Sequence, residues 1–129
     1  MKLRIQGNSL RLRLTQKEVA RVRVGAPVES LLKFAPGRSL IYLLEGSPNA
    51  ETMSATFDGH AIRVTIPTDQ MTEWVDSDRV GIESRPQNGI QLLVEKDFQC
   101  LHRSVEQEPD AYPHPLMSRR GAQHQLLRD

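Results

Sequence analysis

Four cationic side chains near the start of the chain have the types and spacing that could do chemistry. They are Lys2, Arg4, Arg11 and Arg13, and each alternates with apolar residues. Lys and Arg are the usual protein partners of phosphate and carboxylate groups, and Arg can bind either group through two parallel hydrogen bonds. These four residues therefore form the candidate site, for an anionic small molecule or for a protein partner.

Whether the four cations meet depends on the local fold of residues 1–14. Apolar residues stand at odd positions in residues 2–6 and at even positions in residues 9–14. One continuous strand would move its apolar side chains to the opposite face halfway along. The pair Gly7-Asn8 is suited to a two-residue hairpin turn, so we predict a hairpin at this point.

The hairpin determines which residues face one another across the two strands. Apolar residues pair on one face, and on the other face Lys2 lies opposite Arg13 and Arg4 opposite Arg11. Like charges placed directly opposite destabilise a strand pair, by roughly 0.2–1 kcal/mol each. Two explanations are open. Either neighbouring strands place Glu or Asp beside these cations, or the cationic face binds an anion such as a phosphate-bearing ligand or a nucleic-acid backbone.

The composition disfavours nucleic acid as the partner. The chain has only three Phe, two Tyr and one Trp, whereas base-stacking modules rely on exposed aromatic side chains. Residues 1–25 carry seven Lys and Arg against one Glu, yet the formal net charge of the whole chain is +1. The remainder is therefore acidic, which permits internal pairing as readily as an external partner.

No other group of residues forms a recognisable catalytic or metal site. Cys100 and His102 make a Cys-x-His pair, but zinc needs about four ligands and no second pair of that kind exists. The chain also lacks a glycine-rich phosphate loop, a nucleophile motif and a paired acid and base. We predict no metal and no cofactor, and a non-enzymatic binding or interaction protein. The alternative is a small barrel that binds or hydrolyses a phosphate-bearing or carboxylate-bearing molecule.

The location expected from the sequence is the cytoplasm. A single Cys excludes an internal disulfide, and no apolar segment follows the basic N-terminal residues as it would in a secretory signal. The longest apolar run, residues 40–44, is far too short to cross a membrane. No membrane partner is expected.

A short helix is predicted over residues 16–24, directly after the hairpin. Thr15 and Glu18 have the spacing of a capping box, in which each side chain bonds the backbone N–H of the other residue. The β-branched content of residues 21–24 leaves a strand there as an alternative.

A second short helix is predicted after Pro67, with Thr68 or Asp69 as its N-cap. Three apolar residues at helical spacing give this helix one buried stripe, and they are Met71, Trp74 and Val75.

The rest of the chain to residue 96 has the pattern of short strands joined by turns. The predicted strand pairs are 28–34 with 39–45, 52–57 with 60–66, and 79–84 with 90–95. The fold class is therefore α+β, a mostly antiparallel sheet of about eight short strands that forms a barrel or half-barrel, with two short helices. An exposed edge of such a sheet could support a homodimer.

The domain is expected to span residues 1–103. Residues 104–129 are rich in Pro, Gln, Arg and Glu and hold few apolar side chains. Such a composition cannot bury enough apolar surface to offset the entropy of ordering, so we expect an extended, partly disordered tail.

Four segments resemble a family of short bacterial proteins that is known only as a domain of unknown function. The segments are IQGNSLRLRLTQKEV, WVDSDRVGI, LLVEKDFQCL and DAYPHP. The resemblance covers the chain to about residue 115 and implies a bacterial cytosolic protein without an assigned activity. It carries over no catalytic residue, and it suggests that residues 110–115 belong to the domain.

Overall fold

The computed structural model describes residues 1–84, 89–98 and 110–116. The chain divides into two units, Met1–Phe98 and Gln99–Asp129. In the second unit the described residues are exposed, and the backbone N–H of Leu116 donates to Nδ1 of His114 at 3.0 Å. Most of the predicted tail therefore lies outside the described residues.

The first unit alternates hairpins with helices. Its elements are, in order, β1 (Lys2–Gln6), β2 (Ser9–Leu14), α1 (Gln16–Arg23), β3 (Val28–Ala35), β4 (Arg38–Ser47), β5 (Ser54–Phe57), β6 (Ala61–Pro67), α2 (Thr68–Asp76), β7 (Gly81–Ser84) and β8 (Gln91–Lys96). Each half of this sequence runs hairpin, helix, hairpin. All four predicted strand pairs are confirmed as antiparallel hairpins.

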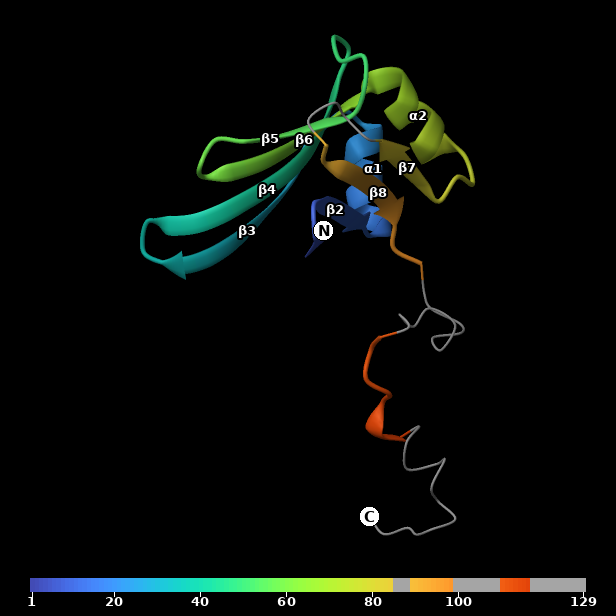
Figure 1. The fold of residues 1–129 in the computed structure, drawn as a ribbon. Helices are drawn as coiled ribbons and strands as arrows, with labels where there is room; N and C mark the ends of the chain where they lie inside the picture. The colour runs from blue at the N-terminus through green and yellow to red at the C-terminus, as the bar shows by residue number, and fades with distance from the viewer. Residues whose placement is uncertain (85–88, 99–109, 117–129) are drawn as a thin grey trace. The chain divides into compact units, whose positions relative to one another are not determined.

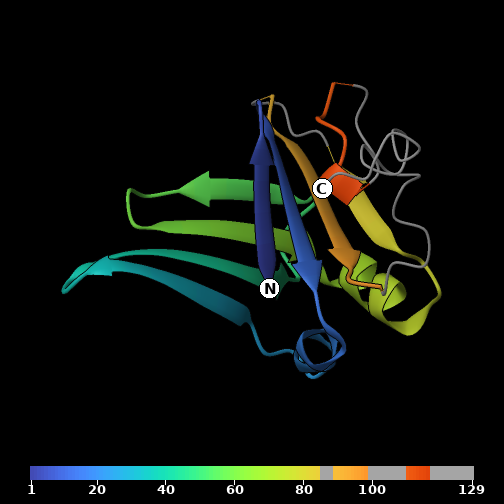
Figure 2. The same ribbon diagram turned by 90° about the horizontal axis from the view of Figure 1, so that it is seen from below.

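The strands form two four-stranded sheets rather than one. Sheet A has the order β1-β2-β8-β7 and sheet B the order β3-β4-β6-β5. Each half of the chain contributes one hairpin to each sheet, and the two hairpins of a sheet meet through a parallel pair, β2 with β8 or β4 with β6. The strands of sheet A cross those of sheet B (Figures 1 and 2). The α+β class and the mostly antiparallel pairing are confirmed.

Of the two predicted arrangements, a barrel or a half-barrel, the closed barrel does not form from the described strands. Each sheet ends in two edge strands, β1 and β7 in sheet A and β3 and β5 in sheet B. The alternating pattern of the sequence is the same in a closed barrel and in an open sheet. It therefore does not show which hairpins pair with each other.

The N-terminal hairpin has the register that the parity of its apolar residues predicts. Lys2 pairs with Arg13, Leu3 with Leu12, Arg4 with Arg11, Ile5 with Leu10 and Gln6 with Ser9. Gly7 has φ +55°, the left-handed conformation that this tight turn requires and that glycine adopts without steric cost.

The first helix is confirmed with its capping box. The Thr15 hydroxyl accepts from the backbone N–H of Glu18, and the Glu18 carboxylate accepts from that of Thr15. The helix ends at Arg23, so the alternative strand over residues 21–24 does not form.

The second helix is confirmed, but its predicted N-cap is wrong. The helix begins at Thr68, so Pro67 occupies the N-cap position in place of Thr68 or Asp69. Pro67 makes no side-chain hydrogen bond to the first turn. Its apolar stripe is buried as predicted, and the Trp74 indole N–H donates to the carbonyl of Val80 at 3.0 Å.

The hydrophobic core lies between the two sheets and the two helices. Sheet A contributes alternate residues of β2 and β8, and sheet B contributes alternate residues of β4 and β6. The residues with the least exposure are Leu12, Leu14, Leu44, Met53, Val64, Ile66, Trp74, Leu92 and Val94. The face of each sheet that lines this core is called its inner face below. The β3–β4 hairpin projects beyond the core and the helices in both views (Figures 1 and 2).

Candidate functional site

The four predicted cations do come together, on the outer face of sheet A. Strand β8 lies beside β2 and places Glu95 next to Arg13. Nε of Arg13 donates to Oε1 of Glu95 at 2.7 Å, and Nε of Arg11 lies 3.5 Å from the same oxygen. One largely buried carboxylate thus serves two of the cations.

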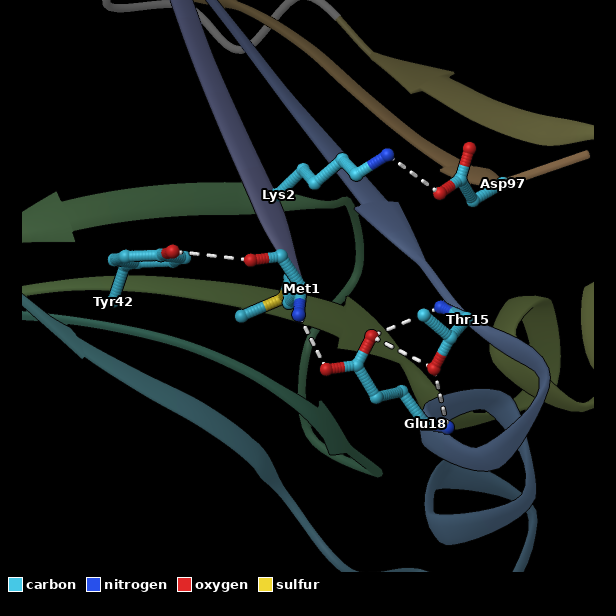
Figure 3. A network of polar contacts seen from close by, with 6 residues as sticks. All are labelled: Met1, Lys2, Thr15, Glu18, Tyr42 and Asp97. Atoms are coloured by element: carbon cyan, nitrogen blue, oxygen red, sulfur yellow. Dashed lines mark hydrogen bonds and ion pairs between the residues drawn. The ribbon is translucent and has the colours of Figure 1, made fainter.

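The other two cations, Lys2 and Arg4, also have polar partners. Nζ of Lys2 lies 3.0 Å from Oδ2 of Asp97 (Figure 3), and Nη2 of Arg4 donates to Oε1 of Gln6 at 3.3 Å. The neighbouring strand and the residue after it thus place carboxylates beside three of the four cations, which is the arrangement that the first of the two explanations predicts. These four cations and two carboxylates are called the cationic face below.

A second polar network joins the N-terminus to two elements, α1 and β4 (Figure 3). The Met1 ammonium group forms an ion pair with Oε2 of Glu18 in α1. Oε1 of the same carboxylate accepts from the Thr15 backbone N–H at 2.9 Å. The Met1 carbonyl accepts from the Tyr42 hydroxyl of β4 at 3.0 Å, so sheet A, α1 and sheet B are connected at one place.

This network lowers the pKa of Glu18. Burial alone would raise the pKa of this carboxyl, because it disfavours the charged form. The hydrogen bond and charge of the Met1 ammonium, together with the hydrogen bonds from Thr15, outweigh burial. The net result is a pKa below the ordinary value of Glu, so the carboxylate stays ionised at neutral pH.

An apolar cleft lies where the inner faces of the two sheets diverge. Its volume is about 290 Å³, and its apolar lining comes from Ile5, Leu10 and Ile90 beside sheet A and from Leu40, Ala55, Phe57 and Ile62 of sheet B. The turn after β1 also lines the cleft. Its polar side chains form hydrogen bonds within the protein: Nδ2 of Asn8 donates to the carbonyl of Gly89 at 2.9 Å, and the Ser9 hydroxyl donates to the carbonyl of Gln6 at 2.7 Å.

The cleft and the cationic face lie on opposite faces of the same two strands. Ile5 and Leu10 point to the cleft, whereas their neighbours Arg4 and Arg11 point away from it, because side chains alternate along a strand. An anionic ligand seated in the cleft would therefore not contact the cationic face. Sequence reasoning missed the cleft because residues far apart in the chain build it, and the sequence carries no local signal for it.

The third candidate surface is the outer part of the β3–β4 hairpin. Leu31, Leu32 and Phe34 are 59%, 50% and 70% exposed. The register shifts between Lys33 and Ala35, so Phe34 stands at a β-bulge. The run LLKF at residues 31–34 is the sequence signal that could have indicated this surface. Its apolar residues fall on both faces of a strand, so one face must expose some of them.

The remaining sequence candidates gain no support as a metal or catalytic site. Cys100 and His102 lie outside the described residues. In the part of the chain that the structure describes, no three His, Cys, Asp or Glu side chains gather closely enough to hold a metal ion. None of the described helices is long and apolar enough to cross a membrane.

Comparison with known proteins identifies a family but no activity. Residues 1–116 match a family described as a family of unknown function (DUF7009). No curated protein and no solved structure matches the chain. The resemblance inferred from the four sequence segments is confirmed as far as a domain of unknown function, and residues 110–115 fall within the match.

Proposed function

Because the chain belongs to this family of unknown function, we propose a role from its own surface: it is a non-enzymatic interaction module of the bacterial cytoplasm. Its binding surface is the β3–β4 hairpin. The observation that carries this proposal is the exposure of Leu31, Leu32 and Phe34 on a strand at the edge of sheet B.

The β3–β4 hairpin differs from the N-terminal hairpin in how its apolar residues are used. Leu10 and Leu12 of β2 are buried in the core, and the outer face of the β1–β2 hairpin is charged. The distal part of β3 instead exposes apolar side chains on both faces. Long apolar edge strands of this kind invite pairing with another strand, because their backbone N–H and C=O groups are unpaired on one side.

Site-directed photo-crosslinking in cells tests this proposal. A benzophenone amino acid in place of Phe34 is expected to yield a covalent adduct with a protein partner. The same amino acid in place of Lys17, which is exposed on α1, serves as the control. Adducts at neither position, or equal adducts at both, would exclude the hairpin as the interaction surface.

A second candidate function is the binding of a small apolar molecule in the cleft between the sheets. The cleft volume is close to the lower end of the range for ligand pockets, about 300 Å³, and its lining is almost entirely apolar. Because the cations face away from it, we expect an uncharged aliphatic group to bind as well as its carboxylate counterpart.

We also propose weak anion binding at the cationic face formed by Lys2, Arg4, Arg11 and Arg13. The gathering of four cationic side chains on one face of two paired strands supports it. Glu95 opposes it, because this carboxylate already occupies the position between Arg11 and Arg13 that an anion would take.

A further inference from the structure

We propose that β3 pairs with β3 of a second copy of this chain, antiparallel and centred on Leu31. This inference rests on the proposed interaction role and names its partner. It would extend sheet B of one molecule continuously into sheet B of the other, around a twofold axis.

The hydrogen bonds of sheet B show which backbone groups of β3 face the open edge. The backbone N–H of Ile41 donates to the carbonyl of His60, so the polar groups of Ile41 point toward β6. Successive residues of a strand point their N–H and C=O groups in opposite directions, so those of Tyr42 point toward β3. Tyr42 pairs with Ser30, and Ile41 pairs with Leu31.

It follows that Leu31 directs its N–H and C=O away from β4, toward the open edge. The same holds for Glu29 and Lys33, two residues to either side. Among the residues that the structure describes, β3 has no strand on that side, because it is the first strand in the order of sheet B. Three alternate residues, Glu29, Leu31 and Lys33, therefore direct their backbone N–H and C=O groups to the open edge. They are enough for about six main-chain hydrogen bonds with an identical edge.

The charges along this edge are self-complementary about Leu31. When Leu31 lies opposite Leu31 of the second copy, Glu29 lies opposite Lys33 of that copy, and Lys33 opposite its Glu29. Both side chains are exposed, and within the described residues neither makes an ion pair. Pairing in this register creates two reciprocal ion pairs, and opposite charges across strands are favourable.

The alternative registers and the other edges are less suitable. Centring the pair on Glu29 or on Lys33 places like charges opposite each other, which is unfavourable. The edge strand β1 carries Lys2 and Arg4, so two copies of it would bring cations together. Strands β5 and β7 have only four residues each.

Apolar packing accompanies the backbone pairing on the outer face. Leu31 of each copy lies beside the other, and Phe34 and Ile41 line the same shallow concavity as Leu31. The exposed apolar surface of the hairpin would thus be covered by an identical surface.

Sedimentation velocity over a concentration series of the full chain tests this pairing. The unmodified chain is expected to form a dimer, and Glu29→Lys and Lys33→Glu are each expected to weaken it by at least about tenfold, since each variant places like charges opposite in both ion-pair positions. An equimolar mixture of the two variants is expected to form a heterodimer, because the two cations on β3 of one variant then face the two carboxylates on β3 of the other. Far-UV circular dichroism of each variant checks that the exposed substitutions leave the fold intact.

A monomer at all concentrations, full dimerisation of both single variants, or a mixture that fails to associate would each overturn the inference. The crosslinking experiment separates this failure from failure of the proposed function. If the chain is a monomer but the probe at residue 34 captures a different protein, the interaction role stands and self-pairing is wrong. An adduct with the mass of two copies of this chain supports both.

Discussion

The Tyr42 hydroxyl donates a hydrogen bond to the carbonyl of Met1 at 3.0 Å, and this bond links β4 of sheet B to the residue that precedes β1 of sheet A. The same Met1 residue forms an ion pair with Glu18, whose carboxylate completes the capping box of α1. Helix α1 and strand β4 are thus both bonded to Met1, through its ammonium group and its carbonyl group.

The substitution Tyr42→Phe tests the link between the two sheets. It removes the hydroxyl but keeps the ring, so the expected loss is about 0.5–1.5 kcal/mol in the free energy of unfolding, the usual contribution of one hydrogen bond. Urea unfolding measures it. Tyr112→Phe is the matched control, because Tyr112 is 96% exposed and should show no change. Equal effects of the two substitutions would mean that the hydroxyl of Tyr42 does not stabilise the fold.

The substitution Glu18→Gln is expected to make stability less dependent on acid pH. The pKa of Glu18 is lowered in the folded protein, so its ionised form stabilises the fold. That contribution is complete above the pKa of the unfolded chain and is lost as the pH falls through the folded pKa. At neutral pH the variant should be less stable by about 1–3 kcal/mol, because a charged partner is left unpaired, and the difference should shrink on acidification.

Urea unfolding at a series of acid pH values measures this difference. Glu73→Gln is the control, because Glu73 pairs with Arg79 at an exposed position and should show little effect at any pH. A difference between Glu18→Gln and the unmodified chain that stays constant with pH would contradict an ionised, stabilising Glu18.

Anion binding at the cationic face is tested by thermal unfolding with a panel of phosphate esters at low salt. The unmodified chain should rise in melting temperature, and Arg4→Ala/Arg11→Ala should not. Glu95→Gln should respond more strongly than the unmodified chain, since it removes the carboxylate that competes for Arg11 and Arg13. The absence of any shift, or equal shifts in all three proteins, would leave the four cations with a structural role only.

The apolar cleft is tested by NMR titration with 1-octanol and octanoate. Methyl signals of Ile5, Leu10 and Ile62 should shift with both compounds. Ala55→Leu should weaken both responses, because Ala55 pairs with Val64 on the inner face and lines the cleft.

Ala61→Leu is the matched control for the cleft. Ala61 pairs with Ile41 on the opposite face of sheet B, so this substitution should leave the binding of both compounds unchanged. A response confined to octanoate would instead point to an anion site away from the cleft.

Local features of this fold could be read from the sequence because their causes are local. The change of parity around Gly7-Asn8 predicts the register of β1 with β2 residue by residue, since a tight turn leaves the two strands no other pairing. The capping box of Thr15 and Glu18 likewise depends only on residues within one helical turn.

The sequence by itself therefore determined the hairpins, the helices and the placement of four cations on one strand face. Only the tertiary structure decided what those cations meet, because Glu95 is 82 residues from Arg13 and reaches it through the parallel pairing of β2 with β8. The same holds for the apolar cleft and for the open edge of β3. The alternation of apolar residues indicates which face of a strand is buried. Which hairpins pair with each other depends on how much apolar surface the whole chain can bury at once.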